Sequence, residues 1–209
     1  MVVIAWAVGL TLLNELVFRR RKAPTQSARR HQQNVQKARQ LIDHLNTFKG
    51  PGQEGRLLNY LRKIDPYVFE ELSLKGFERH GFRVVRNNRY SGNGGLDGTV
   101  YSQTGDCYLL QAKRYRGLIS RQHLLDFGQL IGKLSPGMNR VAGGYFIHTG
   151  RTPQCLFAVA RSPQTTILSG HTLLAFLFPD LNHTEVASNQ ECIRPALFGD
   201  TPPAKNSYR

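Results

Sequence analysis

The hydrophobic and polar positions of the chain form an N-terminal helical block followed by alternating strands and helices. Apolar residues recur at helical spacing over residues 27–48 and again over 54–64. Asp65 followed by Pro66 is a helix start, because an N-cap residue precedes proline at the first helical position. The pattern therefore predicts a third helix over residues 66–80.

Beyond this block, short apolar runs alternate with segments of helical spacing. The runs predict strands at residues 82–85, around Asp97, ending at Lys113, at 141–148 and at 165–168. The intervening segments predict helices over residues 120–134, 152–161 and 172–177. This order indicates an α/β fold with a mixed central sheet, helices on both of its faces and an N-terminal helical extension.

Polar groups gather on the two predicted strands within residues 92–115. Gln111 and Lys113 are two residues apart on an apolar strand, so they project from the same face. If the strands pair through the turn at Gly105-Asp106, Asp97 lies beside them. A carboxylate, an amide carbonyl and an ammonium group would then meet at one sheet edge. The alternative is that Asp97 is a turn residue and Lys113 a solvated charge.

This group of residues suits metal-assisted attack on a phosphodiester. Mg²⁺ is held by a few protein oxygens together with substrate phosphate and water, so a small ligand set suffices. Asp97 would supply negative charge, and the Gln111 side chain with the Ala112 backbone carbonyl would supply neutral oxygens. Lys113 would orient the attacking water. Mn²⁺ is the alternative ion.

The charge of the chain indicates a polyanionic partner. The formal net charge is +14 with a pI near 10.2, which attracts nucleic acid in a salt-dependent manner but also suits anionic lipid. The three cysteines are scattered, with neither disulfide nor zinc-ligand spacing, and indicate a reducing compartment.

The N-terminal residues favour a membrane anchor. Residues 2–18 form an apolar run with no basic residue before it and four basic residues directly after it. The positive-inside rule then places the rest of the chain in the cytoplasm, at an inner membrane that the chain crosses once. The alternative is an amphipathic or buried helix that docks on the protein. The helix over 27–48 could pack on the main domain, dimerise or lie on the membrane.

Four segments resemble, in order, the nuclease domain of the Mrr-like restriction endonucleases, a branch of the PD-(D/E)xK superfamily. They are IDPYVFEELSLKGFERHGFRVV, GNGGLDG, YLLQAKRYRGLIS and YFIHTG, within residues 65–177. The resemblance implies that Asp97 binds metal, that Gln111 occupies the family's Glu-or-Gln position and that Lys113 is the catalytic lysine. It also implies that Glu70 completes the metal site. The glutamine removes one negative charge and predicts weak, partly substrate-dependent metal affinity.

Arginines flank this predicted site. Arg86 and Arg89 precede or lie within a glycine-rich loop, and Arg114 and Arg116 follow the catalytic lysine. All four are predicted DNA contacts, although the loop could equally be a flexible hairpin turn. Cutting both strands would normally require two copies of the site, which makes a homodimer a candidate assembly.

The leading hypothesis is a Mg²⁺-dependent DNA endonuclease tethered to the cytoplasmic side of the membrane. Its parts are an anchor at 1–22, a basic helical linker at 23–64, a nuclease domain at 65–178 and an irregular tail at 179–209. One alternative is a nuclease-fold DNA-binding module without catalysis, favoured by the missing carboxylate at Gln111. Another is a membrane-anchored interaction protein of a DNA-transfer or DNA-processing system.

Overall fold

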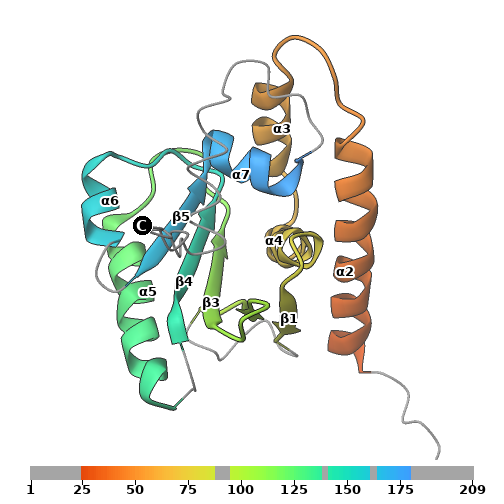
Figure 1. The fold of residues 1–209 in the computed structure, drawn as a ribbon. Coiled ribbons are helices and arrows are strands. Elements are labelled where there is room, and N and C mark those ends of the chain that lie inside the picture. The colour runs from red at the N-terminus through yellow and green to blue at the C-terminus, as the bar shows by residue number, and fades with distance from the viewer. Residues whose placement is uncertain (1–24, 88–94, 138–140, 161–163, 180–209) are drawn as a thin grey trace, which may run out of the picture.

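The computed structural model describes residues 25–87, 95–137, 141–160 and 164–179. Within them, five strands form one sheet in the order β1-β2-β3-β4-β5, with helices on both faces (Figure 1). The strands are β1 (Arg83–Arg86), β2 (Gly98–Tyr101), β3 (Cys107–Lys113), β4 (Val141–His148) and β5 (Thr165–Ser169). The helices are α2 (Gln26–Leu45), α3 (Gln53–Leu61), α4 (Pro66–Arg79), α5 (Arg121–Leu134), α6 (Cys155–Ala160) and α7 (Gly170–Leu177), with a 3₁₀ turn at Ser135–Gly137.

The sheet is mixed, as predicted. β1, β2 and β3 pair antiparallel, and β3, β4 and β5 pair parallel. The β2–β3 connection is the predicted turn, in which Gly105 has φ +84° and Thr104 Oγ1 donates to Asp106 Oδ2 at 2.7 Å. The parallel pairs require crossover connections, which run through α5 and α6. The predicted fold class is confirmed.

Alternation along the strands divides the core between the two faces of the sheet. Leu110 and Ala112 of β3 join the larger core with α2, α3, α4 and α7, whereas Leu109 joins a second core with α5 and α6. Phe77 of α4 lies at the centre of the larger core, with its ring centroid 4.7 Å from that of Tyr145. These contacts hold α4 against the strands that carry the candidate site.

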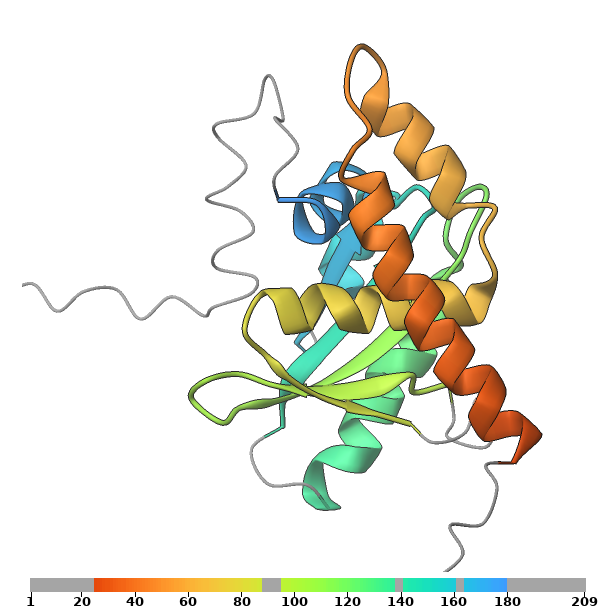
Figure 2. The same ribbon diagram turned by 90° about the vertical axis from the view of Figure 1, so that its right-hand side faces the viewer.

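The N-terminal helix α2 is part of the larger core. Ala38, Ile42 and Leu45 are buried on its inner face, and Figure 2 shows the helix running diagonally across α4. Thr25 caps it by accepting a hydrogen bond from the backbone N–H of Ala28 at 3.2 Å. Packing on the main domain is therefore the arrangement observed among the three that the sequence left open.

Small shifts of the element ends have local causes. β1 begins after Phe82, because the Phe82 N–H donates to the Phe77 carbonyl of α4 at 3.0 Å. The helix predicted over 152–161 begins only at Cys155, since Thr152 bonds His148 and Ser169 instead. The helix predicted over 172–177 begins at Gly170, because Ser169 and Thr172 form a capping box.

Two predicted segments lie at the ends of the chain that the structure does not describe. The predicted anchor at 1–22 and residues 180–209 of the predicted tail lie outside the described residues. Among the helices that the structure describes, none is both long enough and apolar enough to span a bilayer.

Candidate active site

Asp97 lies just before β2 and is held by β3 through both its backbone and its side chain. Its N–H donates to the carbonyl of Leu110 at 2.9 Å, and its Oδ2 accepts the N–H of Ala112 at 2.6 Å. The carboxylate thus extends the hydrogen bonding between β2 and β3 one step past the last paired residues, Gly98 and Leu110. Backbone groups two residues apart on a strand face the same edge, so the Ala112 carbonyl lies on the Asp97 side of β3.

Gln111 presents a buried acceptor. Its Nε2 donates to the carbonyl of Gly95 at 2.7 Å, which fixes the orientation of the amide because a carbonyl oxygen accepts only from the nitrogen. Its Oε1 is buried and has no hydrogen-bond partner among the described residues. A buried oxygen without a partner costs free energy, and a cation bound at this oxygen would remove the cost.

Glu70 of α4 brings a second carboxylate to Asp97. Burial, followed by the negative charges of Asp97, Glu71 and Asp65, raises the pKa of Glu70 to about 8, while Lys113 acts to lower it. Burial also raises the pKa of Asp97 to about 7, against the lowering effects of the Ala112 N–H and of Lys113. Two carboxylates and one ammonium group therefore share one partly buried region.

The side chains present fit a hard divalent cation. Carboxylate and amide oxygens are the ligands that Mg²⁺ prefers, and Glu70, Asp97 and Gln111 offer both kinds. The described residues contain no group of three or more His, Cys, Asp or Glu that could hold a metal. The ligand set would therefore depend on the amide oxygen of Gln111, and the metal roles of these residues remain predictions.

Gly95 supports this arrangement and offers a test of it. It has φ +87°, and a Cβ there would lie 2.4 Å from Gln111 Nε2. Gly95→Ala should displace the amide and reduce cleavage by about 10²-fold, since a shift of about 1 Å can have that effect. Gly132→Ala is the control, because a Cβ at Gly132 meets nothing within 4 Å. Equal cleavage by the two variants in a plasmid assay would contradict the role given to Gln111.

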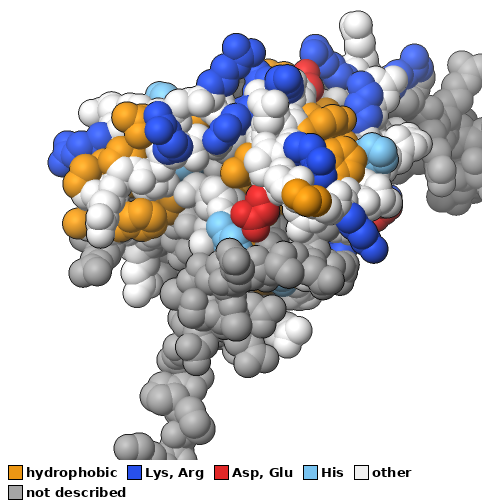
Figure 3. All heavy atoms as spheres, turned by 90° about the horizontal axis from the view of Figure 1, so that it is seen from above, with side chains coloured by type: hydrophobic (Ala, Val, Ile, Leu, Met, Phe, Trp, Pro, Cys, Tyr) orange, Lys and Arg blue, Asp and Glu red, His pale blue; other side chains and the backbone are white. Residues whose placement is uncertain are grey.

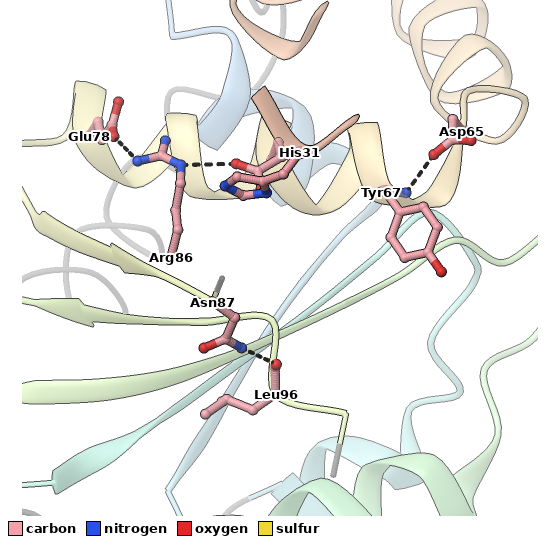
Figure 4. Close-up of polar contacts among 8 residues, drawn as sticks. His31, Asp65, Tyr67, Glu78, Arg86, Asn87 and Leu96 are labelled. Atoms are coloured by element: carbon pink, nitrogen blue, oxygen red, sulfur yellow. Dashed lines mark hydrogen bonds and ion pairs between the residues drawn. The ribbon is translucent and has the colours of Figure 1, made fainter. Parts of the chain in front are cut away.

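Arg86, a predicted DNA contact, binds carboxylates of α4. Its Nε lies 2.9 Å from Glu71 Oε2 and its Nη1 2.6 Å from Glu78 Oε1, as Figure 4 shows for Glu78. Glu71 is also contacted by His31 of α2, whose Nδ1 lies 3.3 Å from Glu71 Oε1. Arg86, Glu71 and His31 come from β1, α4 and α2, so their ion pairs hold these three elements together. Glu71 is only 3% exposed. A phosphate contact by Arg86 stays a prediction.

Removing Arg86 should therefore destabilise the fold. Arg86→Ala leaves the buried Glu71 with less compensation, and we expect a loss of about 2–3 kcal/mol in the free energy of unfolding. Arg83→Ala on the same strand is the control, since Arg83 is exposed and stacks on Tyr101, 4.0 Å from the ring centroid, at about 0.5–1 kcal/mol. Urea denaturation of both variants measures the difference, and equal midpoints would refute it.

The other predicted DNA contacts are Arg114, Arg116 and Arg89, and each has a different environment or lies outside the described residues. Arg114 Nη1 donates to the carbonyl of Arg62 at 3.1 Å, and Arg116 is exposed in the loop after β3. Arg89 lies outside the described residues. DNA contact by any of them is a prediction.

Thr149 is a positioning residue whose role the sequence did not reveal. Its Oγ1 donates to the Tyr115 carbonyl at 2.8 Å and accepts the Tyr115 N–H at 3.0 Å, which joins the loops after β3 and β4. The Thr-Gly pair after β4 was the available signal, but a pairing across 34 residues is visible only in the fold. Tyr115 also bonds His123 through its hydroxyl, beside the end of β3.

His148 is buried within the same region and serves the structure. Burial lowers its pKa to about 4, which makes it neutral at pH 7. Its Nδ1 accepts the Gly150 N–H at 3.2 Å, and its Nε2 lies 3.0 Å from Thr152 Oγ1. The imidazole thus orders the loop after β4.

The mixed sheet, with helices on both faces and a polar group at the end of its central hairpin, defines a restriction-endonuclease-like domain. The restriction endonuclease family Mrr_cat matches residues 61–177, which is more than half of the chain. The protein belongs to this family, as the resemblance of the four sequence segments implied, and it carries a nuclease domain of that class.

Two solved structures are similar to the chain. Restriction endonuclease FokI shares 12% identity with a TM-score of 0.46, over 62% of this chain and 28% of that one. The MspJI restriction endonuclease in complex with a 27-mer oligonucleotide shares 18% identity with a TM-score of 0.46, over 78% of this chain and 39% of that one. The chain therefore spans less than half the length of either protein. No curated protein matches it.

Proposed function

We propose that this protein is a Mg²⁺-dependent DNA endonuclease that hydrolyses phosphodiester bonds, with Mn²⁺ as an alternative ion. One observation carries the proposal: the charges of Glu70, Asp97 and Lys113 lie close enough to act on one another. The unpartnered buried oxygen of Gln111 supports a bound cation in the same region.

Each residue has a separate part in the proposed hydrolysis. Asp97, Glu70 and Gln111 would hold Mg²⁺, which activates water and offsets the negative charge that develops on the phosphate. Lys113 orients the attacking water and adds positive charge beside the scissile phosphate. Asp97 keeps its orientation through the Ala112 N–H, 2.6 Å away. Water bonds to phosphorus as the P–O bond to one of the two sugars breaks, the departing oxygen takes up a proton to become a hydroxyl group, and no covalent enzyme intermediate forms.

DNA is the proposed substrate because of the family and the charge. The protein belongs to a restriction endonuclease family, and one similar solved structure contains an oligonucleotide. A net charge of +14 favours binding to such a polyanion and makes it sensitive to salt. A homodimer would supply the second site needed to cut both strands.

The N-terminal residues support membrane attachment as a further part of the proposal. The apolar run at 2–18 is followed by four basic residues, which suits one span with the nuclease domain on the cytoplasmic side. Flotation of the full chain with inner-membrane vesicles, compared with a fragment beginning at Thr25, tests the attachment. Equal flotation of the two would refute the anchor.

A plasmid assay tests the catalytic proposal. A fragment beginning at Thr25 retains α2, whereas a cut before Gly50 would remove the core residues Ala38, Ile42 and Leu45. We expect this fragment to nick supercoiled plasmid with Mg²⁺ or Mn²⁺, and to lose the activity in EDTA or as Asp97→Ala. Equal nicking by the wild type and Asp97→Ala would disprove the assignment.

Two other functions give different results in the same experiments. A DNA-binding module without catalysis, favoured by Gln111 in place of a carboxylate, would bind DNA but leave plasmid intact with either ion. A membrane-anchored interaction protein would lack DNA affinity in the fragment beginning at Thr25.

A further inference from the structure

Helix α2 brings a cation to the start of α4, near the candidate site. The guanidinium carbon of Arg30 lies 5.9 Å from the ring centroid of Tyr67. Tyr67 is in the first turn of α4, three residues before Glu70, so both side chains lie on the same side of that helix. In Figure 4 the ring of Tyr67 extends from α4 toward the strands. Arg30 is thus one side chain away from the helix position that carries Glu70.

The packing of α2 fixes Arg30 at this place. The next residue, His31, contacts the buried Glu71 at 3.3 Å, and Asn34 and Ala38 are buried one and two turns further along. These contacts set both the rotation and the position of α2 against α4. Arg30 itself is exposed, so its charge faces solvent beside the site.

Two more arginines, on other elements, are linked to each other by a hydrogen bond, and one of them, Arg62, is three residues before the N-cap Asp65 of α4. Arg62, at the C-cap of α3, donates from Nε to the Thr149 carbonyl at 2.9 Å. Its own carbonyl accepts from Arg114 Nη1 at 3.1 Å, and Arg114 directly follows Lys113. The structure records one hydrogen bond for each of these guanidinium groups among the described residues. A guanidinium has five N–H donors, so both retain donors for a ligand.

We call Arg30, Arg62 and Arg114 the arginine rim. They come from α2, α3 and the loop after β3. Arg30 lies over Tyr67 in the first turn of α4, and Arg62, which is bonded to Arg114, is three residues before the N-cap Asp65. Asp65 is the acidic residue at this turn, and it accepts the Tyr67 N–H at 2.9 Å as the helix cap. Figure 3 views the molecule from the α3 end, where Lys and Arg side chains are spread over the surface with few acidic ones between them.

We propose that the arginine rim binds DNA phosphates beside the candidate site, and that α2 is thereby part of the DNA interface. The choice of DNA as the ligand rests on the proposed function. Planar guanidinium groups suit phosphate oxygens because two N–H groups can bind together. Arg30 lies before the residues that match the family, so family membership does not assign this contact.

Helix α2 provides a matched control. Arg39 is nine residues after Arg30, which is two and a half helical turns and therefore the opposite side of α2. It is exposed, and it lines a pocket with Lys75 and Arg79 away from the arginine rim. Arg39→Ala removes the same charge from the same helix, so it separates a local contact from a general charge effect.

The test measures binding of a fluorescent DNA duplex to the full chain in neutral detergent with EDTA, so that no cutting occurs. We expect Arg30→Ala and Arg62→Ala each to weaken binding about 5–10-fold at low salt. Each should also reduce the slope of log K against log salt by about 1, as for one lost phosphate contact. Arg39→Ala should bind almost as wild type, and Arg62→Lys, which keeps the charge but not the paired N–H groups, should recover only part of the loss.

Arg62 also bonds the Thr149 carbonyl, so its replacement could weaken the fold. The melting temperatures of the same variants measure this effect on stability separately from DNA binding. A structural role alone predicts that Arg62→Ala lowers the melting temperature without changing the salt slope, which would overturn the proposal for Arg62. The contact that the structure records for Arg30 among the described residues is its stacking over Tyr67, so its variant should melt within a few degrees of wild type.

The outcomes separate this proposal from the proposed catalysis. If the wild type binds DNA through the arginine rim but does not cut plasmid, the rim stands and the enzyme proposal fails. If the wild type cuts, yet Arg30→Ala and Arg62→Ala bind as Arg39→Ala does, the rim alone is refuted. Anionic phospholipid vesicles form the second arm of the test, with the fragment beginning at Thr25 and without detergent, so that residues 2–18 do not mediate the binding. Loss of vesicle binding in Arg30→Ala with unchanged DNA binding would assign the arginine to lipid and overturn the proposal.

Discussion

Lys113→Ala should reduce plasmid cleavage by about 10³-fold or more while leaving DNA binding nearly intact. Its ammonium group is the cation that acts on both carboxylates, Glu70 and Asp97, at the end of β3. Loss of a group that orients water and offsets transition-state charge typically costs about 10²–10⁴ in rate. The measurement is the initial nicking rate of supercoiled plasmid with Mg²⁺, together with duplex binding in EDTA.

Lys133→Ala is the control for the lost charge. Lys133 is exposed in the last turn of α5, and its replacement should leave both cleavage and binding unchanged. Wild-type cleavage by Lys113→Ala would remove this residue from the catalytic scheme. Parallel loss of binding and cleavage would instead make it a DNA contact.

Glu70→Gln should abolish cleavage and yet stabilise the metal-free protein at pH 8. Because burial and neighbouring negative charges raise the pKa of Glu70 from 4.5 to about 8, the folded protein keeps a proton that the unfolded chain has released. The stability of the wild type should therefore fall as pH rises from 4.5 to 8. Glutamine is neutral throughout and removes this contribution. Thermal unfolding from pH 5 to pH 8 in EDTA measures it.

With added Mg²⁺ at pH 8, the wild type should become more stable than Glu70→Gln. A cation that binds only the folded state stabilises it, so Mg²⁺ should raise the melting temperature of the wild type at pH 8 and have little effect on Glu70→Gln. An identical response of the two proteins to Mg²⁺ would exclude Glu70 as a ligand.

Glu78→Gln on the same helix should have the opposite effect on stability. Although burial acts to raise its pKa, hydrogen bonds from Arg86 and Lys75 hold the pKa of Glu78 below its ordinary value. Its charge is therefore stabilising above pH 4.5, and the glutamine variant should be less stable at pH 8. Stabilisation by both variants would show that the effect at Glu70 is not specific to the site.

Much of the fold could be predicted because its signals are local. The strand ending at Gln111-Ala112-Lys113 and the β2–β3 turn follow from apolar runs and from a glycine that adopts φ +84°. The helix start at Asp65-Pro66 was likewise correct, since the carboxylate caps the helix from two residues away. Such features depend on residues close together in the chain.

The hydrophobic and polar pattern of the sequence did not predict contacts between segments that are distant along the chain. Arg86 belongs by sequence to a basic loop, but the fold surrounds it with Glu71 and Glu78, 15 and 8 residues earlier. His31 and Asn34 resemble the polar residues around them, yet they lie on the buried side of α2 against α4. Polar residues on an amphipathic face carry no signal of the partner that they meet.

The sequence by itself predicted the strand and helix order, the family and the candidate catalytic residues, because these follow from spacing within segments and from the order of four motifs along the chain. The tertiary structure decided that α2 packs on α4, that Arg86 is held by carboxylates, that Arg30 lies over Tyr67 and that Arg62 bonds the Thr149 carbonyl. The physical reason is that burial and charge interactions depend on which surfaces meet in space, and spacing along the chain does not contain that information.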